Sequence, residues 1–250
     1  MTAPGQDFAG RRGAALVVGG NGGIGARVAA MLAERGATVA VTYRRTPAEG
    51  VASHHLDLGS PDAAAQAARV VADVLAEHGG LHTLVHAAGP HVPRRHLGRV
   101  SAEEMSTQLH DDAGGFFTVV RAALPALRES HGAVVAVTTA ATTRFPKRDG
   151  LSSAPKAAVE AMVRALAVEE GRYGVRVNAV GPGMLTDGMA ARLIGSGELS
   201  QEALDVTRRN IPLGTFGTAD DVAEAVCFLA SDRAGFISGQ KLDVDGGYGA

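Results

Sequence analysis

Short runs of valine and alanine alternate with longer helical patterns along most of the chain, and this alternation limits the possible folds more than any other feature. Consecutive parallel strands need a long crossover, usually a helix, and strands covered by helices on both faces are apolar throughout. The alternation therefore predicts an α/β fold, a doubly wound Rossmann-type parallel sheet with helices on both faces. The expected strands are Ala14–Val18, Thr38–Thr42, His54–Leu56, Thr83–His86, Ala133–Thr138, Arg176–Val180 and Lys241–Val244. The expected helices are Ile24–Arg35, Pro61–His78, Ala102–Leu127, Pro155–Arg172, Ala190–Gly195 with Gln201–Asn210, and Ala219–Ala230.

Composition excludes several classes of protein. The net charge is −2 and the basic residues are spread along the chain, which argues against a nucleic-acid partner. No apolar stretch approaches the length of a membrane span, so no membrane partner is expected. The single cysteine, Cys227, excludes an internal disulfide and lies in the apolar run DVAEAVCFLA, where a buried thiol is expected. These features favour a cytoplasmic protein in a reducing compartment.

No linker, repeat or low-complexity segment divides the 250 residues, so a single domain is expected over residues 11–250. The first ten residues lack the apolar core of a signal peptide, and residues 1–10 are expected to form a flexible lead-in. The segment at about 183–214 contains glycines and is moderately polar, which is typical of a lid over a small or medium organic substrate.

A glycine-rich turn joins the first strand to the first helix, in the stretch ALVVGGNGGIGARVAAMLAERGATVAVTYRR. Glycines at such a turn let the backbone approach a pyrophosphate, and the helix N-terminus offers free N–H groups to the phosphates. The position between a strand and a helix, with a second strand about 20 residues on, predicts a dinucleotide site. The alternative is a tight turn with no ligand. The residues assigned to this part of the site are Gly19, Asn21, Gly22, Gly23, Ile24 and Gly25.

The end of the second strand carries two arginines, Arg44 and Arg45, where a fold that prefers NAD usually has an acidic residue for the ribose hydroxyls. Because a guanidinium suits a 2′-phosphate by charge and by its planar donor fork, NADP(H) is favoured over NAD(H). The alternative is two solvated surface charges. After the third strand, Asp57 and Leu58 are expected to hold the adenine, with the Asp57 carboxylate accepting a hydrogen bond from the adenine amino group. The alternative is that Asp57 is a helix-start residue.

With these pieces assembled, the chain resembles the short-chain dehydrogenase/reductase family from about Gly10 to Gly247. The stretch VVGGNGGIG is similar to its Thr-Gly-x-x-x-Gly-x-Gly turn, with Val18 at the threonine position. HAAG, from His86, is similar to its Asn-Asn-Ala-Gly segment with both asparagines lost, and RVNAVGPGMLTDGM and FLASDRAGFISGQKLDVDGG resemble its nicotinamide-side and C-terminal regions. The resemblance implies seven parallel strands, a nicotinamide cofactor and a homotetramer or dimer. It also implies cofactor contacts from Ala87, Ala88, Gly89, Lys156, Pro182, Gly183 and Thr186.

The resemblance also implies a set of catalytic positions. In this family a Tyr-x-x-x-Lys pair transfers the proton, a serine on the preceding strand orients the substrate, and an asparagine on the long central helix organises a water. Lys156 aligns with the lysine, but Ser152 stands at the tyrosine position, Thr139 at the strand serine and Asp112 at the asparagine. Thr139 keeps a hydroxyl, whereas Ser152 is shorter than tyrosine and lacks a phenol with a pKa of about 10. Pro155 has no N–H, and the helix is expected to begin there with Ser152 or Ser153 near its cap.

Asp112 indicates a different source for the proton, because a carboxylate near the site can hold or activate a water while Lys156 supplies positive charge to a developing oxyanion. The chain resembles the peroxisomal-type 2,4-dienoyl-CoA reductases here, a branch of the family that lacks the tyrosine and has an aspartate on this helix. The alternative for Asp112 is a helix-surface or interface carboxylate.

Three histidines, at positions 86, 91 and 96, recur in the loop HAAGPHVPRRHL, which is expected to border the substrate. No metal site is expected, since no thiol or carboxylate joins them at ligand spacing. His91 is a possible substitute proton donor or an ordinary loop histidine. Thr139 and Met184 are the other expected substrate contacts.

Two classes of function follow. The first is an NADPH-dependent reductase with a non-standard proton relay, acting on a ketone or a conjugated C=C group of a small-molecule or acyl substrate, in a biosynthetic pathway. The second is a non-redox protein of the same fold, either a nucleotide-binding pseudoenzyme or a catalyst of elimination or cyclisation.

Overall fold

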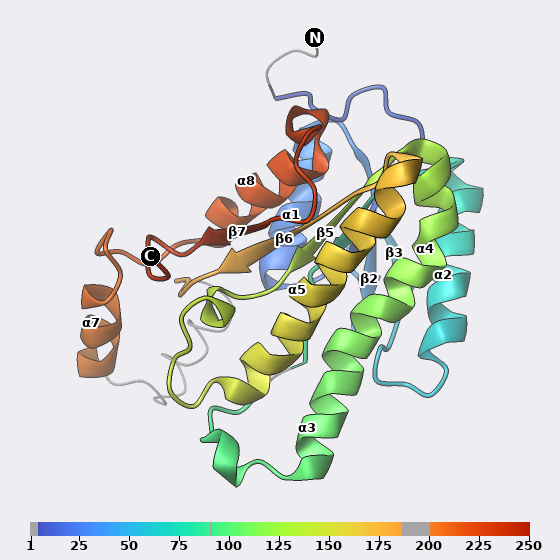
Figure 1. Ribbon diagram of the computed structural model, residues 1–250. Coiled ribbons are helices and arrows are strands. Elements are labelled where there is room, and N and C mark those ends of the chain that lie inside the picture. The colour runs from blue at the N-terminus through green and yellow to red at the C-terminus, as the bar shows by residue number, and fades with distance from the viewer. Residues whose placement is uncertain (1–4, 91, 187–200) are drawn as a thin grey trace.

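A seven-stranded parallel sheet runs through the centre of the molecule (Figure 1), in the order β3-β2-β1-β4-β5-β6-β7. The structure is a computed structural model that describes residues 5–90, 92–186 and 201–250. Its strands are β1 (Ala14–Val18), β2 (Thr38–Tyr43), β3 (Ala52–His55), β4 (Leu81–His86), β5 (Ala133–Val137), β6 (Arg176–Pro182) and β7 (Lys241–Val244). The predicted Rossmann-type fold is therefore confirmed.

Helices cover both faces of this sheet. The α-helices are α1 (Gly23–Glu34), α2 (Ala63–His78), α3 (Ala102–Leu109), α4 (Gly115–Ser130), α5 (Gly150–Glu170), α7 (Gln201–Arg209) and α8 (Ala219–Ala230). One face packs against α1 and α8, and the other packs against α2, α4 and α5. No helix among the described residues combines the length and apolarity that crossing a membrane requires.

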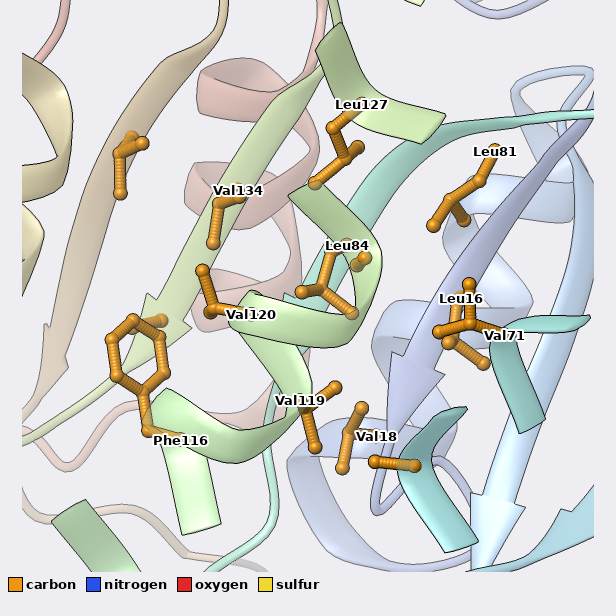
Figure 2. Close-up of a cluster of buried hydrophobic side chains, with 14 of the residues drawn as sticks. Leu16, Val18, Val71, Leu81, Leu84, Phe116, Val119, Val120, Leu127 and Val134 are labelled. Atoms are coloured by element: carbon orange, nitrogen blue, oxygen red, sulfur yellow. The ribbon is translucent and has the colours of Figure 1, made fainter. Parts of the chain in front are cut away.

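Alternating strand residues point into two separate cores, one on each face of the sheet. Leu16 and Leu84 pack with Val120 of α4 on one face, as Figure 2 shows, whereas Val17 and Val85 pack against the α1 and α8 face. All four strand residues are completely buried, which explains why the strand sequences are apolar without alternation. The strand order reverses between β1 and β4, and the crevice at their carboxyl ends is where such sheets bind ligands.

The helix expected over Ala102–Leu127 is divided in the structure. Helix α3 begins at a capping box in which Ser101 and Glu104 bind each other's backbone N–H groups. A π-helical turn, His110–Gly114, then separates α3 from α4. Such a turn inserts one extra residue into a helix and is often found at functional sites. Here it contains both Asp111 and Asp112.

Helix α5 begins at Gly150, so the expectation that it begins at Pro155 is wrong. Asp149 occupies the N-cap position, and its carbonyl accepts hydrogen bonds from the N–H groups of Ser152 (3.0 Å) and Ser153 (2.9 Å). Pro155 removes one backbone hydrogen bond from the helix, but it is buried together with Leu151, and this packing holds the turn that precedes the proline.

Smaller differences concern the ends of elements. Strand β3 covers Ala52–His55 rather than His54–Leu56, and α2 begins at Ala63 rather than Pro61. Phe8, within the expected lead-in, is 1% exposed, and its N–H donates to the carbonyl of Arg35 at 3.0 Å, so this part of the segment packs on the domain. The helix expected at Ala190–Gly195 lies outside the described residues.

Candidate active site

The glycine-rich turn between β1 and α1 is held by close backbone contacts. Gly19 has φ +77°, and a Cβ there would lie 2.8 Å from the Cα of Ala88. A Cβ on Gly25 would lie 2.2 Å from the carbonyl oxygen of Gly19, so the helix packs directly on the turn. Gly22 is the N-cap of α1, with open space around it and no side-chain cap. The first N–H groups of α1 therefore face the crevice without a capping side chain, as an anion site requires.

A cavity of about 380 Å³ opens at the carboxyl ends of β1, β2, β3 and β4. It is lined by Val18, Gly19, Asn21, Gly22, Thr42, Tyr43, Arg44, Arg45, Leu56, Asp57, Leu58, Gly59, Ala87, Ala88, Gly89, Pro90 and Asp111. Ten of the predicted cofactor residues are in this lining; Gly23, Ile24, Gly25, Lys156, Pro182, Gly183 and Thr186 are not. The volume and the elements around it suit the adenosine and pyrophosphate half of a dinucleotide.

Two arginines contribute positive charge to the cavity. Arg44 and Arg45 are both exposed, and within the described part of the chain neither guanidinium forms an ion pair or a hydrogen bond. The N–H of Gly19 donates to the hydroxyl of Thr42 at 3.0 Å, which fixes the turn against the end of β2. Sequence reasoning missed Thr42, although its place at the end of the second strand was visible.

Two carboxylates, those of Asp57 and Asp111, also line the cavity. Oδ1 of Asp57 accepts the N–H of Gly59 at 3.1 Å, and the N–H of Asp57 donates to Gln66 Oε1 at 2.9 Å. Asp111 reaches the cavity from the π-helical turn. Sequence reasoning did not assign Asp111 to the site, because only the three-dimensional fold brings this turn beside the loop after β3.

The next residue, Asp112, is 2% exposed and forms an ion pair with Lys156 of α5, with 2.8 Å between Oδ1 and Nζ. The lysine side chain is 13% exposed. A Cβ on Gly89 would lie 3.4 Å from Lys156 Nζ, so the ammonium lies beside the loop that lines the cavity. The structure thus brings together Asp112, Lys156 and Gly89, three of the positions that the sequence analysis assigned to the site.

Two hydroxyl groups lie on the elements next to this ion pair. Ser152 is half-buried on α5, one helical turn before Lys156, and no hydrogen bond of its hydroxyl is found within the described residues. Thr139 is the second residue after the end of β5, and its hydroxyl oxygen accepts the N–H of Ala141 at 3.1 Å. That bond uses an acceptor site, so the Thr139 hydroxyl remains able to donate.

His86, at the end of β4, is completely enclosed near the ion pair. Burial lowers the pKa of His86 to about 3, and the positive charge of Lys156 contributes in the same direction. The ring lies edge-on to Phe116 at 5.4 Å between centroids, and neither ring nitrogen has a hydrogen-bond partner among the described residues. The imidazole is therefore neutral at physiological pH and adds no charge to compete with Lys156.

The other expected positions lie elsewhere or outside the description. Gly183 binds the carbonyl of Val244 through its N–H (2.9 Å), and Thr186 binds that of Gly217 in the same way (2.8 Å). Met184 packs against the small cluster formed by Leu204, Ile211 and Phe216. His91 and residues 187–200 of the expected lid are outside the described residues. Nowhere in the described ranges do three or more His, Cys, Asp or Glu side chains come together as metal ligands would.

Comparison with known proteins identifies the family. The family model described as enoyl-(acyl carrier protein) reductase matches residues 18–249. The chain is 34% identical to versicolorin reductase stcU of Emericella nidulans, over 93% of this chain and 94% of the relative. It is 33% identical to the 3-oxoacyl-[acyl-carrier-protein] reductase FabG of Staphylococcus aureus, over 93% and 96% of the two chains. This protein belongs to the short-chain dehydrogenase/reductase family.

Solved structures agree with this assignment. A short-chain type dehydrogenase/reductase from Mycobacterium ulcerans superimposes with a TM-score of 0.87 and 28% identity, covering 96% of this chain and 91% of the other. The Cj0485 dehydrogenase superimposes with a TM-score of 0.88 over 97% and 96% of the two chains, and its 23% identity shows the shared fold. In this short-chain dehydrogenase/reductase the cavity lies at the carboxyl ends of the strands, where the strand order reverses and such sheets bind ligands.

Proposed function

We propose that this chain is an NADP(H)-dependent reductase in which the Asp112–Lys156 pair organises proton delivery, in place of the tyrosine typical of the family. The observation that carries the proposal is the 2.8 Å ion pair between these side chains, buried beside the loop that lines the cavity. The relatives named versicolorin reductase and 3-oxoacyl-[acyl-carrier-protein] reductase support a reductase.

The residues of the cavity fit a nicotinamide dinucleotide with a 2′-phosphate. The uncapped N-terminus of α1 and the open space at Gly22 suit the pyrophosphate. The guanidinium groups of Arg44 and Arg45, which have no partner in the described part of the chain, suit the 2′-phosphate, and Asp57 suits the adenine amino group. When bound and reduced, the cofactor supplies a hydride.

Lys156 has three N–H donors, of which one is directed at Asp112. The other two remain for a ribose hydroxyl or for an oxyanion that develops on the substrate. The second carboxylate oxygen of Asp112 is an acceptor that can orient a water, and the ammonium beside it stabilises the hydroxide left when that water gives up its proton. The Thr139 hydroxyl would donate to a substrate oxygen.

This arrangement favours a conjugated C=C bond over an isolated ketone. In a conjugated enone or dienoyl thioester, hydride addition to carbon produces an enolate, whose negative charge Lys156 stabilises, and the enolate then takes a proton from water. In a ketone the oxygen needs a proton as the hydride arrives, and the Ser152 hydroxyl is too short and too weakly acidic to provide it. A ketone remains the second substrate class within this proposal.

The test restores a tyrosine, the usual proton donor of the family, at position 152. NADPH oxidation is measured on a panel of ketones, enones and dienoyl thioesters for the parent, Ser152→Tyr and Ser152→Phe. We expect Ser152→Tyr to raise ketone reduction by about 10²-fold, because the phenol would lie one turn from Lys156, whose charge lowers the phenol pKa. Ser152→Phe adds the ring without the hydroxyl and should give no increase.

The role of Asp112 is tested on the conjugated substrates. Asp112→Asn keeps the shape and removes the charge, and we expect it to lower turnover by about 10²-fold while NADPH still binds. Unchanged turnover would show that the proton comes from elsewhere. If the parent binds NADPH tightly and reduces no substrate, the redox proposal is wrong and a non-redox role follows.

A further inference from the structure

Two acidic side chains of the cavity lining flank one glycine. We propose that Asp111 is a specificity-determining residue that, together with Asp57, selects a nucleotide base carrying an exocyclic amino group and rejects a base with a carbonyl at that position. The inference rests on the proposed nucleotide-binding function, which it makes more specific.

Both carboxylates are positioned around Gly59. Asp57 Oδ1 accepts the Gly59 N–H at 3.1 Å, and a Cβ on Gly59 would lie 3.3 Å from each carboxylate oxygen of Asp111. The carboxylate of Asp111 therefore lies over the Cα of this glycine. All three residues belong to the cavity lining, so the two acids face the same enclosed space from two different elements.

Asp111 is available to a ligand, whereas its neighbour Asp112 is not. Within the described residues, no hydrogen bond or ion pair occupies either oxygen of Asp111, and the side chain is half-buried. Asp112 is instead committed to Lys156 at 2.8 Å. The π-helical turn directs these consecutive carboxylates to different ends of the site. An acceptor that is partly removed from water and has no protein partner gains most from a ligand donor.

The chemistry of the two groups determines which base fits. An ionised carboxylate only accepts hydrogen bonds. The amino group of adenine has two N–H donors, one for each acid, whereas the carbonyl of hypoxanthine would direct an acceptor oxygen at two carboxylates. A site that attracts the amino group of adenine and also repels the carbonyl of hypoxanthine discriminates between the two bases more strongly than attraction alone would.

The experiment compares binding of NADPH with binding of its deamino analogue, which has hypoxanthine in place of adenine and keeps the 2′-phosphate and the nicotinamide. Affinity is measured from the fluorescence of the reduced nicotinamide, with no substrate present. We expect the parent to bind the analogue about tenfold more weakly. Asp111→Asn should narrow this difference to about threefold, because its amide can donate to the carbonyl while Asp57 still opposes it.

Asp62→Asn is the matched control. It removes the same charge from a residue that is exposed at the start of α2 and does not line the cavity. It should leave the ratio of the two affinities unchanged, even if both affinities rise from reduced repulsion of the phosphates. Asp111→Val provides a second test of the ratio, should the asparagine variant fail to give the parent's thermal unfolding curve.

The outcomes separate the inference from the proposed function. If the parent binds neither nucleotide, the nucleotide-binding function itself is wrong. If the parent binds both equally, or if Asp111→Asn and Asp111→Val keep the parent's ratio, Asp111 does not select the base. A change of both affinities by the same factor would show that Asp111 acts only through its charge.

Discussion

His86 is a polar ring enclosed near Lys156, with no hydrogen-bond partner among the described residues. A charged imidazole at this place would repel Lys156 and compete for Asp112. Burial prevents this by lowering the pKa of His86 to about 3. The ammonium of Lys156 thus remains the positive group that faces Asp112, which the proposed proton delivery requires.

The lowered pKa predicts how stability depends on pH. Between about pH 6.5 and pH 3 the unfolded chain binds a proton at His86 that the folded chain does not, so the contribution of His86 opposes folding increasingly as the pH falls. For a single group the free energy of unfolding falls by about 1.4 kcal/mol per pH unit in this range. We expect His86→Asn to make the slope shallower by that amount between about pH 6 and pH 4, measured by urea unfolding.

His82 provides a comparison at the other end of β4. Burial lowers the pKa of His82 to about 4. His82→Asn should therefore also make the dependence of the free energy of unfolding on pH shallower. Its effect on this slope should end near pH 4, whereas the effect of His86→Asn should continue to about pH 3. An unfolding slope that His86→Asn leaves unchanged would mean that the imidazole is not held neutral in the folded protein.

At the scale of elements, the sequence predicted the strands and most helices but not their irregularities. Continuous apolar runs predicted β1 and β5 because burial on both faces leaves little choice of residue. The π-helical turn at His110–Gly114 has no comparable sequence signal, since it depends on how α3 and α4 pack on neighbouring elements. The start of α5 was placed five residues late because the packing of Leu151 and Pro155 outweighs the local preference of proline.

The candidate site shows the same division. Lys156 and Asp112 were assigned from the resemblance to the family, and the glycine-rich turn was predicted from its local spacing between a strand and a helix. Asp111 was missed because Gly59, which it approaches closely in the fold, is distant from it in the sequence. The replacement of a catalytic tyrosine by Ser152 stays a prediction, as does the role of Thr139.

In the turn between β1 and α1, one glycine is needed for the fold and another for the approach of the ligand, so two variants can test these needs separately. Gly19→Ala places a Cβ at φ +77° and 2.8 Å from Ala88, and we expect it to lower the free energy of unfolding by about 1–3 kcal/mol and to weaken NADPH binding. Gly22→Ala is the control, because Gly22 has φ −161° and open space around it. Urea unfolding and NADPH titration should show that Gly22→Ala weakens binding and leaves stability nearly unchanged; equal loss of stability would contradict the close contact at Gly19.

At the scale of the whole molecule, the order of the strands determines which charged side chains from distant parts of the sequence lie close together. The order reverses between β1 and β4, so the loops after β2 and β3 reach one side of the crevice and the β4 loop reaches the other. The loops after β2 and β3 therefore bring Arg44 and Arg45 beside Asp57, and the π-helical turn adds Asp111, so cationic and anionic groups line the same cavity. A ligand that carries both a phosphate and an amino group matches this distribution of charge.

The two arginines in the cavity lining predict that NADPH and NADH stabilise the folded protein to different extents. A ligand that binds only the folded state at 100 times its Kd raises the free energy of unfolding by about 2.7 kcal/mol. Because Arg44 and Arg45 have no other partner within the described residues, we expect NADPH to raise the Tm more than NADH at equal concentration. The double variant Arg44→Ala/Arg45→Ala should remove this difference and leave the shift caused by NADH unchanged.

The control for this experiment is Arg69→Ala/Arg121→Ala, which removes two exposed arginines from α2 and α4 that do not line the cavity. It changes the net charge by the same amount, so a loss of NADPH preference in both double variants would indicate long-range attraction of the extra phosphate. Loss in the Arg44/Arg45 variant alone assigns the preference to direct contact with the 2′-phosphate. An equal Tm shift by NADPH and NADH in the parent would contradict the assignment of NADP(H), because two unpaired guanidinium groups at the ribose end would then contribute nothing to binding.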